Sequence, residues 1–359
     1  MRAGASEGVA RVGRWSAALA VGVAAGWLCS VLRTPIPWML GPLFSIAFLR
    51  VMGARLEAPM PSRYAGQWII GTSLGLDFTP LVVRDVAGLW GLLAAGAAFA
   101  VALGYVSGIA LARLAGLDRT TGIFASVPGG AAEMATLGER FGGRADRIAA
   151  AQSLRILIVV AVVPGAITAL GIHGADPYVQ GTAAFDARGF ALLMGATLAG
   201  SLVFQGFGAP NAFVLGSLAV AIPLTALEAD LSAMPAVVSN AGQLLLGCAL
   251  GSRFRRDFLR GARRFVGAVA LTVLLSIALS AAFGAGLAWA SGLHPATLVL
   301  GNAPGGIAEM CITAKVLQLG VPLVTAFHVT RVVVLLLATP AVFERTRRWY
   351  RSRRGRRGS

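Results

Sequence analysis

Long apolar runs are separated along this chain by short clusters of charged residues. Residues 86–112 and 265–293 contain no Asp, Glu, Lys or Arg. A helix of about 20 apolar residues is long enough to cross a bilayer, and a helix satisfies its own backbone hydrogen bonds there. The pattern therefore predicts an all-α polytopic membrane protein.

The apolar runs form two series in the same order, each with a Pro- and Gly-rich segment near its end. The first series predicts helices over 14–32, 36–52, 64–76 and 86–112, the segment 120–138 and a helix over 147–170. The second predicts helices over 189–206, 211–227, 236–252 and 265–290, the segment 296–315 and a helix over 321–343. Spans such as 64–76 are shorter than the roughly 20 residues that a bilayer needs, so we expect them to borrow flanking residues or to lie inside the bundle.

The two series are copies of one sequence. Residues 126–134 (SVPGGAAEM) return 176 positions later as 302–310 (NAPGGIAEM). The same offset relates Gln67 and Gln243, Gly71 and Gly247, Arg155 and Arg331, and Pro164 and Pro340. With a slip of one residue, Pro35 matches Pro210. We therefore divide the chain into a first membrane repeat (1–170), a linker (171–188), a second membrane repeat (189–343) and an Arg-rich tail (344–359).

The placement of Arg predicts how the chain is oriented. The formal net charge is +16, with six Arg in the loop 253–264 and eight in the stretch 345–357. Cytoplasmic loops of membrane proteins are enriched in Lys and Arg. We therefore expect a multi-pass protein of the bacterial inner membrane, with both termini cytoplasmic and the linker periplasmic. On a soluble protein this charge would indicate nucleic acid, but here anionic lipid explains it better.

Counting crossings from these anchors gives each repeat five, and an odd number inverts the second copy relative to the first. The segment 120–138 would then enter from the cytoplasm and the segment 296–315 from outside. The prediction is a five-plus-five inverted repeat, an arrangement found in transporters with broken helices. Because the count fixes only parity, it leaves open whether each break is a re-entrant hairpin or a pair of crossing half-helices.

Each break joins a Pro to two Gly. A Pro disfavours helix just before itself and suits the first turn of a new half-helix. The glycines leave backbone N–H groups uncovered, and a helix N-terminus carries roughly +0.5 of a charge, which suits an anion. The alternative is a turn with close packing, but two breaks at the same spacing favour a binding site. The residues predicted to form it are Pro128, Gly129, Gly130, Pro304, Gly305 and Gly306.

Buried charge accompanies both breaks. Glu133 and Glu309 follow five residues after each Pro, and Arg155 and Arg331 lie 22 residues beyond each Glu in apolar helices. Ionisable residues inside a membrane are costly and mark ion pathways by default. Two interpretations stay open. Closed Glu–Arg pairs would be architectural, whereas pairs that open during transport would form a site that couples an ion or proton.

Several neutral polar residues are also candidates. Gln67 and Gln243 could hydrogen bond a substrate across the bundle or tie helices together. Asn302 stands where the first copy has Ser126, and such differences would make a symmetric scaffold selective. His328 could titrate near neutral pH, although a lone His in a bundle is more often a packing residue.

Catalysis by a metal or with ATP has little support in the sequence. The three Cys and three His show no close spacing typical of a zinc, copper or iron site. No phosphate-binding loop of the Walker type is present. We expect no cofactor and no metal, and we do not expect an enzyme.

The paired motifs Pro128-Gly129-Gly130 and Pro304-Gly305-Gly306, each with its Glu and Arg, resemble the Gram-negative AbrB membrane family, which is defined by such a duplication. The resemblance covers nearly all of both copies. It implies an all-helical membrane fold and a poorly defined activity, since members are labelled as regulators of gene expression or as ammonia monooxygenases. The family is unrelated to the soluble DNA-binding protein of the same name.

Three functions follow as hypotheses. The first is a secondary transporter in which the breaks hold a small anionic solute and the paired Glu carry a proton or ion. The second is a membrane-embedded sensor that affects gene expression indirectly, because no DNA-reading module lies outside the helices. The third, a monooxygenase, lacks metal ligands. The expected partners are lipid and a small solute or ion, without direct nucleic acid, and a homo-oligomer stays open.

Overall fold

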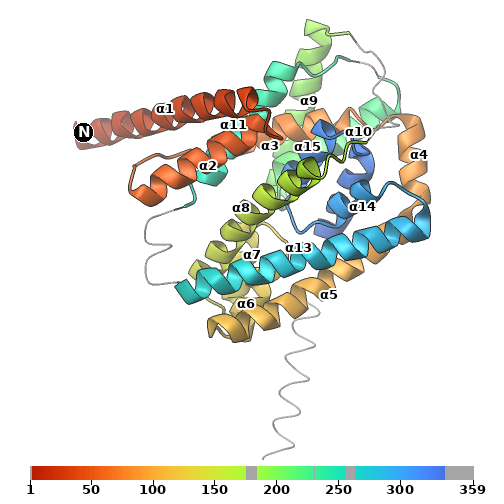
Figure 1. Cartoon of the computed structure of the whole chain (residues 1–359). Coiled ribbons are helices and arrows are strands. Elements are labelled where there is room, and N and C mark those ends of the chain that lie inside the picture. Colours follow the sequence, from red (N-terminus) through yellow and green to blue (C-terminus); the bar gives the residue numbers. More distant parts are fainter. Residues whose placement is uncertain (1, 175–183, 230, 255–262, 336–359) are drawn as a thin grey trace, which may run out of the picture.

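The computed structural model describes residues 2–174, 184–229, 231–254 and 263–335, and within them every regular element is a helix (Figure 1). The first copy contains α1 (Arg2–Val31), α2 (Pro37–Met52), α3 (Met60–Gly75), α4 (Pro80–Gly88), α5 (Trp90–Ala115), α6 (Arg119–Ser126), α7 (Ala131–Arg140) and α8 (Ala145–Ala169). The second contains α9 (Ala187–Gly206), α10 (Ala212–Ala226), α11 (Ala236–Gly251), α13 (Arg263–Ser291), α14 (Pro295–Asn302), α15 (Ile307–Val316) and a last helix over Val321–Leu335. The predicted all-α fold is confirmed.

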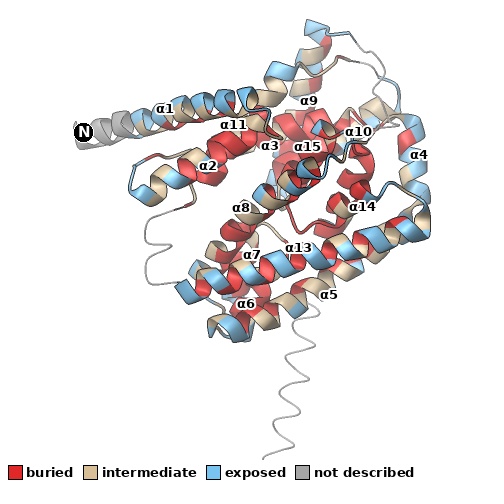
Figure 2. Ribbon diagram, viewed as in Figure 1, coloured by how far each residue is buried: buried red, intermediate tan, exposed pale blue. Residues whose placement is uncertain are grey.

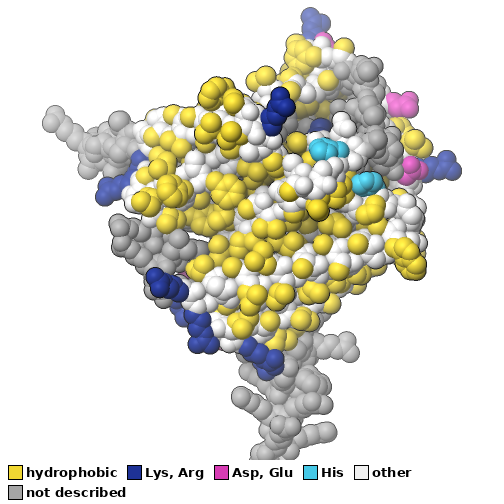
Figure 3. All heavy atoms as spheres, in the orientation of Figure 1, with side chains coloured by type: hydrophobic (Ala, Val, Ile, Leu, Met, Phe, Trp, Pro, Cys, Tyr) yellow, Lys and Arg dark blue, Asp and Glu magenta, His cyan; other side chains and the backbone are white. Residues whose placement is uncertain are grey.

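Five of these helices are long and apolar enough to cross a membrane, namely Arg11–Val31 within α1, α5, α8, α9 and α13. Large apolar side chains are exposed along α1, α5, α9 and α13, and yellow side chains cover much of the face in Figure 3. An apolar surface of this kind suits contact with lipid rather than water. The chain therefore has the features of a helical membrane protein.

One predicted helix begins later than expected and is preceded by a helix that was not predicted. The predicted helix 86–112 begins at Trp90, because a separate helix, α4, precedes it. Thr79 caps α4 by accepting a hydrogen bond from Val82 N, and Pro80 occupies its first turn, a combination that starts helices. The prediction missed this signal. Residues 336–343 of the last predicted helix, the Arg-rich tail, residues 175–183 of the linker and residues 255–262 of the basic loop lie outside the described residues.

The helices pack into two groups. One group, here called bundle A, contains α1, α2, α3, α9, α10 and α11. The other, bundle B, contains α5, α6, α7, α8, α13, α14, α15 and the helix Val321–Leu335. Figure 2 shows buried residues concentrated where the two groups meet, over α3, α10, α14 and α15, while α1 and α13 carry exposed stripes. The molecule thus has an internal interface as well as a lipid-facing surface.

The backbone carries the same offset as the sequence. Left-handed residues occur at Gly116 and again at Gly292, with φ of 66° and 70°. Ile36 and Asn211, which match with the one-residue slip, both have φ of 47° at the start of α2 and α10. A non-glycine residue in this region is uncommon. Two such residues at matched positions show that the helix connections of the two copies are built alike.

The first break is a hairpin. Arg144 N, between α7 and α8, donates a hydrogen bond of 2.8 Å to Thr121 Oγ1 in the first turn of α6. The rings of Phe124 in α6 and Phe141 after α7 stack with centroids 5.7 Å apart. The two ends of the broken segment therefore lie together, with the Pro-Gly-Gly turn at the far tip.

The second break has the same shape. Thr297, in the first turn of α14, lies 3.1 Å from the position of a Cβ atom on Gly320, which follows α15. Gly174 N, beyond the end of α8, donates a 3.1 Å hydrogen bond to Leu317 O at the end of α15. The base of the second hairpin thus lies near the end of α8, and the base of the first lies at its start. At about 1.5 Å per residue, the 25 residues of α8 separate the bases by roughly 37 Å.

Candidate functional site

A cavity of about 60 Å³ lies between the bundles at the tips of both hairpins. Its walls include both breaks, through Pro128, Gly129, Gly130, Gly305 and Gly306. Its polar side chains are Arg63, Gln67, Arg155, Asn211, Arg253, Glu309 and Arg331. The volume is enough for a few waters or one small ion.

In the first copy, a buried arginine holds the break open. Arg155 on α8 donates to Val127 O at 3.1 Å and to Gly129 O at 3.4 Å. Gln152 Nε2, one turn earlier, donates to Phe124 O at 2.8 Å and to Val127 O at 2.9 Å. The last carbonyls of α6 have no partners within their own helix. The side chains of α8 therefore replace the helix hydrogen bonds that Pro128 interrupts.

The second copy repeats this arrangement with one substitution. Arg331 donates to Ala303 O and to Gly305 O, the matched carbonyls. His328, which stands where the first copy has Gln152, bonds Leu300 O through Nε2 at 3.1 Å and Arg331 through Nδ1 at 2.6 Å. Since Arg331 can only donate, Nδ1 is the acceptor and His328 is neutral. His328 is thus a packing residue of the break.

The two glutamates do not pair with these arginines. Neither a Glu133–Arg155 nor a Glu309–Arg331 salt bridge occurs among the described residues. Each Glu instead occupies the third position of its half-helix, α7 or α15, and its Oε2 would clash with a Cβ atom on the glycine that precedes the helix, Gly130 or Gly306. A glutamate at this position reaches back over the helix N-terminus. Each carboxylate therefore lies beside the N-terminus of its own half-helix.

The predicted site residues divide into three groups. The break residues named above, Glu309, both arginines and Gln67 share the central cavity. Asn302 and Pro304 line a smaller cavity of about 20 Å³ on the α5 and α13 side of the tips, together with Pro128 and both arginines. Gln243 lies elsewhere, in a cavity of about 240 Å³ beside Lys315. Glu133 lines none of these cavities, although its Oε2 is buried without a partner.

Arg63, Arg253 and Asn211 line the central cavity but were not predicted as site residues. Arg253 was counted only among the six arginines of the basic loop 253–264. Arg63 lies in the first turn of α3, and Arg253 follows the end of α11. Asn211 Oδ1 accepts a 3.3 Å hydrogen bond from Gln67 Nε2. Only the packing of α3, α10 and α11 against one another brings these residues to the breaks.

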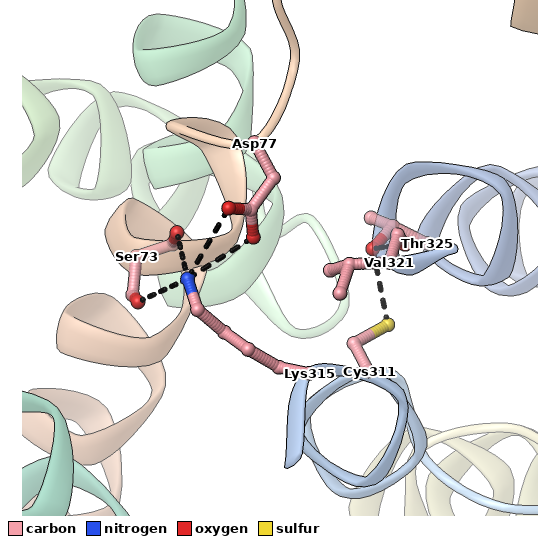
Figure 4. A network of polar contacts seen from close by, with 6 residues as sticks. All are labelled: Ser73, Asp77, Cys311, Lys315, Val321 and Thr325. Atoms are coloured by element: carbon pink, nitrogen blue, oxygen red, sulfur yellow. Dashed lines mark hydrogen bonds and ion pairs between the residues drawn. The ribbon is translucent and has the colours of Figure 1, made fainter. Parts of the chain in front are cut away.

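A partly buried ion pair was also missed. Lys315 Nζ lies 3.1 Å from Asp77 Oδ2 and donates to Ser73 O and Oγ at 3.3 Å (Figure 4). Asp77 is 6% exposed. Lys315 lies in the last turn of α15 in bundle B, whereas Ser73 lies in the last turn of α3 in bundle A and Asp77 follows it. The pair therefore connects the two bundles.

Among the described residues, no three His, Cys, Asp or Glu side chains gather as metal ligands would. The free cysteines Cys248 and Cys311 are buried, and Cys29 is half-buried. The thiol of Cys311 accepts a 3.2 Å hydrogen bond from Thr325 Oγ1 (Figure 4). The monooxygenase hypothesis finds no ligand set in that part of the chain.

Comparison with known proteins gives one family. The family model described as "Transition state regulatory protein AbrB" matches residues 38–347. The "Uncharacterized protein YhjN" of Bacillus subtilis is 26% identical over 358 residues, covering 90% of this chain and 91% of the relative. The "Putative regulator AbrB" of Escherichia coli is 23% identical over 312 residues, covering 86% and 89%. The match spans both hairpins and the cavity between them, and this chain belongs to the AbrB family.

Proposed function

We propose that this protein is a secondary transporter of a small anion, bound in the cavity where the two hairpin tips meet. The observation that carries the proposal is the charge of that cavity. Four arginines and a single glutamate line it. Arginine stays protonated in proteins, and buried charge is stable only when it is paired. An anionic solute would supply the missing negative charge.

The arginines divide into two kinds. Arg155 and Arg331 are committed to break carbonyls, although the Nε atom of each is buried without a hydrogen-bond partner. Arg63 and Arg253 come from bundle A and face the breaks across the cavity. A carboxylate or phosphate between them would accept charge-assisted hydrogen bonds from both bundles. Binding would therefore depend on how the bundles are placed relative to each other.

The position of the two glutamates changes their expected roles. Because Glu133 and Glu309 already lie beside the N-termini of the half-helices, the arginines rather than the N-terminal N–H groups would hold the solute. Glu309 is 7% exposed and lines the cavity. A carboxylate in such a place is costly unless it is protonated or paired. We assign it the coupling role, so that a proton or cation on Glu309 accompanies the anion.

The hairpin geometry supports alternating access. Their bases lie at opposite ends of α8, as an inverted repeat with re-entrant breaks requires. The cavity that holds Gln67 has a matched counterpart in the cavity that holds Gln243, lined by the end of α3 and by Lys315. We call the cavity with Gln67 the first vestibule and the cavity with Gln243 the second vestibule. Each would give the breaks access to one side of the membrane.

The charge distribution supports an orientation. Figure 3 shows several Arg or Lys side chains at the lower left and others at the top and right, while its acidic side chains lie toward the upper right. Arg119, Arg144 and Arg264 belong to the face that holds the base of the first hairpin. The positive-inside rule places this face in the cytoplasm. We propose a bacterial inner-membrane location with the first vestibule facing inward.

Flux in proteoliposomes tests the proposal. Purified protein is reconstituted and offered a panel of small mono- and dicarboxylates and phosphate, with an imposed proton or sodium gradient. We expect gradient-driven uptake of at least one anion. The Glu133→Gln/Glu309→Gln double variant should lose the dependence on the gradient, and Glu228→Gln, a change at an exposed loop residue, should behave as the wild type.

The alternative function is a membrane-embedded sensor, which the printed name of the Escherichia coli relative favours. A sensor would use the same cavity to bind the anion without moving it. Isothermal titration on the same protein separates the two functions. Binding without flux under any gradient would contradict the transporter and support the sensor.

A further inference from the structure

The ion pair between Asp77 and Lys315 is one of few contacts that join bundle A to bundle B. Around it, α15 packs against the end of α3, whereas most other packing stays within one bundle. Lys315 lies in the last turn of α15, at the base of the second hairpin. The pair therefore holds the bundles together on the face that contains this base, next to the second vestibule.

The internal repeat carries this pair onto another pair with the charges exchanged. At the offset of 176 residues, Asp77 corresponds to Arg253 and Lys315 corresponds to Glu139. The register is secure, since Gly75 and Phe78 around Asp77 correspond to Gly251 and Phe254 around Arg253. Both positions of the pair carry the opposite charge in the other copy, so each copy has one acidic and one basic residue, which attract each other. A change in only one member would have placed like charges opposite each other.

The counterpart lies on the opposite face of the molecule. Gly66 on α3 approaches Leu246 on α11, and Ile69 approaches Gly242, so these two helices run antiparallel. Their C-terminal ends, with Asp77 and Arg253, therefore point to opposite faces. Glu139 lies in the last turn of α7, at the base of the first hairpin. Arg253 and Glu139 thus belong to the face opposite the Asp77–Lys315 pair.

In this structure the counterpart pair is not formed. Arg253 lines the first vestibule, and Glu139 is exposed. Within the described residues neither side chain takes part in a salt bridge, and α7 does not pack on α11 as α15 packs on α3. The contact that α15 makes with α3 on one face therefore has no equal between α7 and α11 on the other face.

We propose that Glu139 and Arg253 form an ion pair in a second conformation, in which Asp77 and Lys315 part. The inference rests on the proposed function, because alternating access requires two such states. In the present state Arg253 is free to contact an anion in the first vestibule. In the second state Glu139 forms an ion pair with Arg253 and the first vestibule closes. Lys315 then no longer pairs with Asp77 and can contact an anion in the second vestibule. Each cation thus alternates between a carboxylate and the solute.

Cysteine cross-linking in membranes tests the exchange. In a chain with Cys29, Cys248 and Cys311 replaced by Ala, two double variants are treated with a short bifunctional thiol reagent, Asp77→Cys/Lys315→Cys and Glu139→Cys/Arg253→Cys. A direct disulfide needs Cα atoms within about 7 Å, whereas ion pairs made through the long side chains of Lys and Arg can span more, so the reagent replaces that length and bridges each pair only in its own state. We expect both cross-links to form and each to lock the conformation in which its pair is closed. Glu139→Cys/Lys315→Cys is the matched control, because its positions lie at opposite hairpin bases and should never cross-link.

Distances measured with the native pairs intact complete the test. Spin labels at Arg140 and Ser252, next to the proposed pair, should report a short and a long separation by pulsed electron resonance. Asp77→Asn should raise the short population about threefold and Glu139→Gln should lower it by a similar factor, as expected for loss of one partly exposed ion pair. One separation, unchanged by both variants, together with no cross-link between positions 139 and 253, would overturn the proposal. These measurements need no solute, so they are independent of the flux experiment. Exchange of the ion pairs without flux would refute only the transporter. Flux without exchange would refute only the ion-pair inference.

Discussion

The two hairpins place the same residues at matched positions, but in different surroundings. Glu309 is buried in the wall of the cavity, whereas Glu133 is half-buried and lines none of the three cavities described above. Arg331 is held by His328, whereas the matched Gln152 binds the break carbonyls and leaves Arg155 without a side-chain partner. The second hairpin packs on α3 of bundle A through α15, and α7 of the first hairpin makes no equal contact with α11. The difference shows that one sequence pattern can produce two environments when its two copies pack differently on bundle A.

The largest difference between the hairpins should appear on removal of their arginines. Arg331→Ala leaves two buried carbonyls without a donor, at roughly 1–3 kcal/mol each. Arg155→Ala should cost less, because Val127 O keeps its hydrogen bond from Gln152. Thermal unfolding in detergent, followed by size-exclusion fluorescence, should show a much larger fall in Tm for Arg331→Ala.

Arg140→Gln, at an exposed position in the last turn of α7, is the control for loss of an arginine. Equal losses at Arg155 and Arg331 would mean that the substitution of His for Gln between the copies has no effect on stability, and the comparison of the two hairpins would fail.

Substitution of the glycine next to each glutamate should also have the larger effect in the second hairpin. A Cβ atom on Gly306 or Gly130 clashes with the carboxylate of Glu309 or Glu133. The half-buried Glu133 can swing outward, but Glu309 is enclosed. Overpacking costs typically about 1–3 kcal/mol, so Gly306→Ala should lower both Tm and uptake more than Gly130→Ala. Gly165→Ala in α8 is the control, because no atom lies within 4 Å of its Cβ position.

Much of the break could be predicted from the sequence because it is local and occurs twice. The Pro, the glycines, the Glu in the first turn and the distant Arg stand at fixed spacings that survive in both copies. The partners of Arg155 and Arg331 could not be predicted. An arginine 22 residues from a glutamate can reach either its carboxylate or the carbonyls of the break, and only the orientation of α8 decides between them. In both copies the arginine donates to the carbonyls of the break.

The bundle interface was beyond the sequence analysis for a different reason. Arg63, Arg253 and the Asp77–Lys315 pair depend on which helices of one copy meet those of the other. Charge counting places Arg253 in a cytoplasmic loop, and it does follow the last turn of α11. That the same residue faces the breaks depends on the antiparallel crossing of α3 and α11. The internal repeat does relate Asp77 to Arg253. The two residues have opposite charges, however, so a search for identical residues in the two copies does not find the match.

The two vestibules also differ in one matched residue. The first has Arg63, and the second has Ser239 at the corresponding position. Arg63→Ser makes the first resemble the second and removes a charge-assisted hydrogen bond to the anion. The expected loss of affinity is about tenfold or more, as for a bond of at least 1.5 kcal/mol. Equilibrium binding at two salt concentrations measures it.

Arg264→Ser is the control for the Arg63 variant, since Arg264 lies exposed on the same face and donates to Leu114 O outside the cavity. Its affinity should stay close to that of the wild type. If both variants weaken binding equally, and added salt removes the effect, then Arg63 acts only through long-range attraction and does not contact the solute.

The smallest expected effect concerns Gln67 and Gln243, which donate to Asn211 Oδ1 at 3.3 Å and to Asn240 Oδ1 at 3.5 Å. Neutral hydrogen bonds of this kind contribute about 0.5–1.5 kcal/mol, so Leu at either position should change KM only a few-fold. Each variant should raise KM only for solute that enters through the vestibule that contains the changed glutamine. In oriented vesicles, Gln67→Leu should raise KM for solute added on the face of the first hairpin base, and Gln243→Leu for solute on the other face. Equal effects from both sides would mean that the two glutamines tie helices together rather than contact the solute on its way to the breaks.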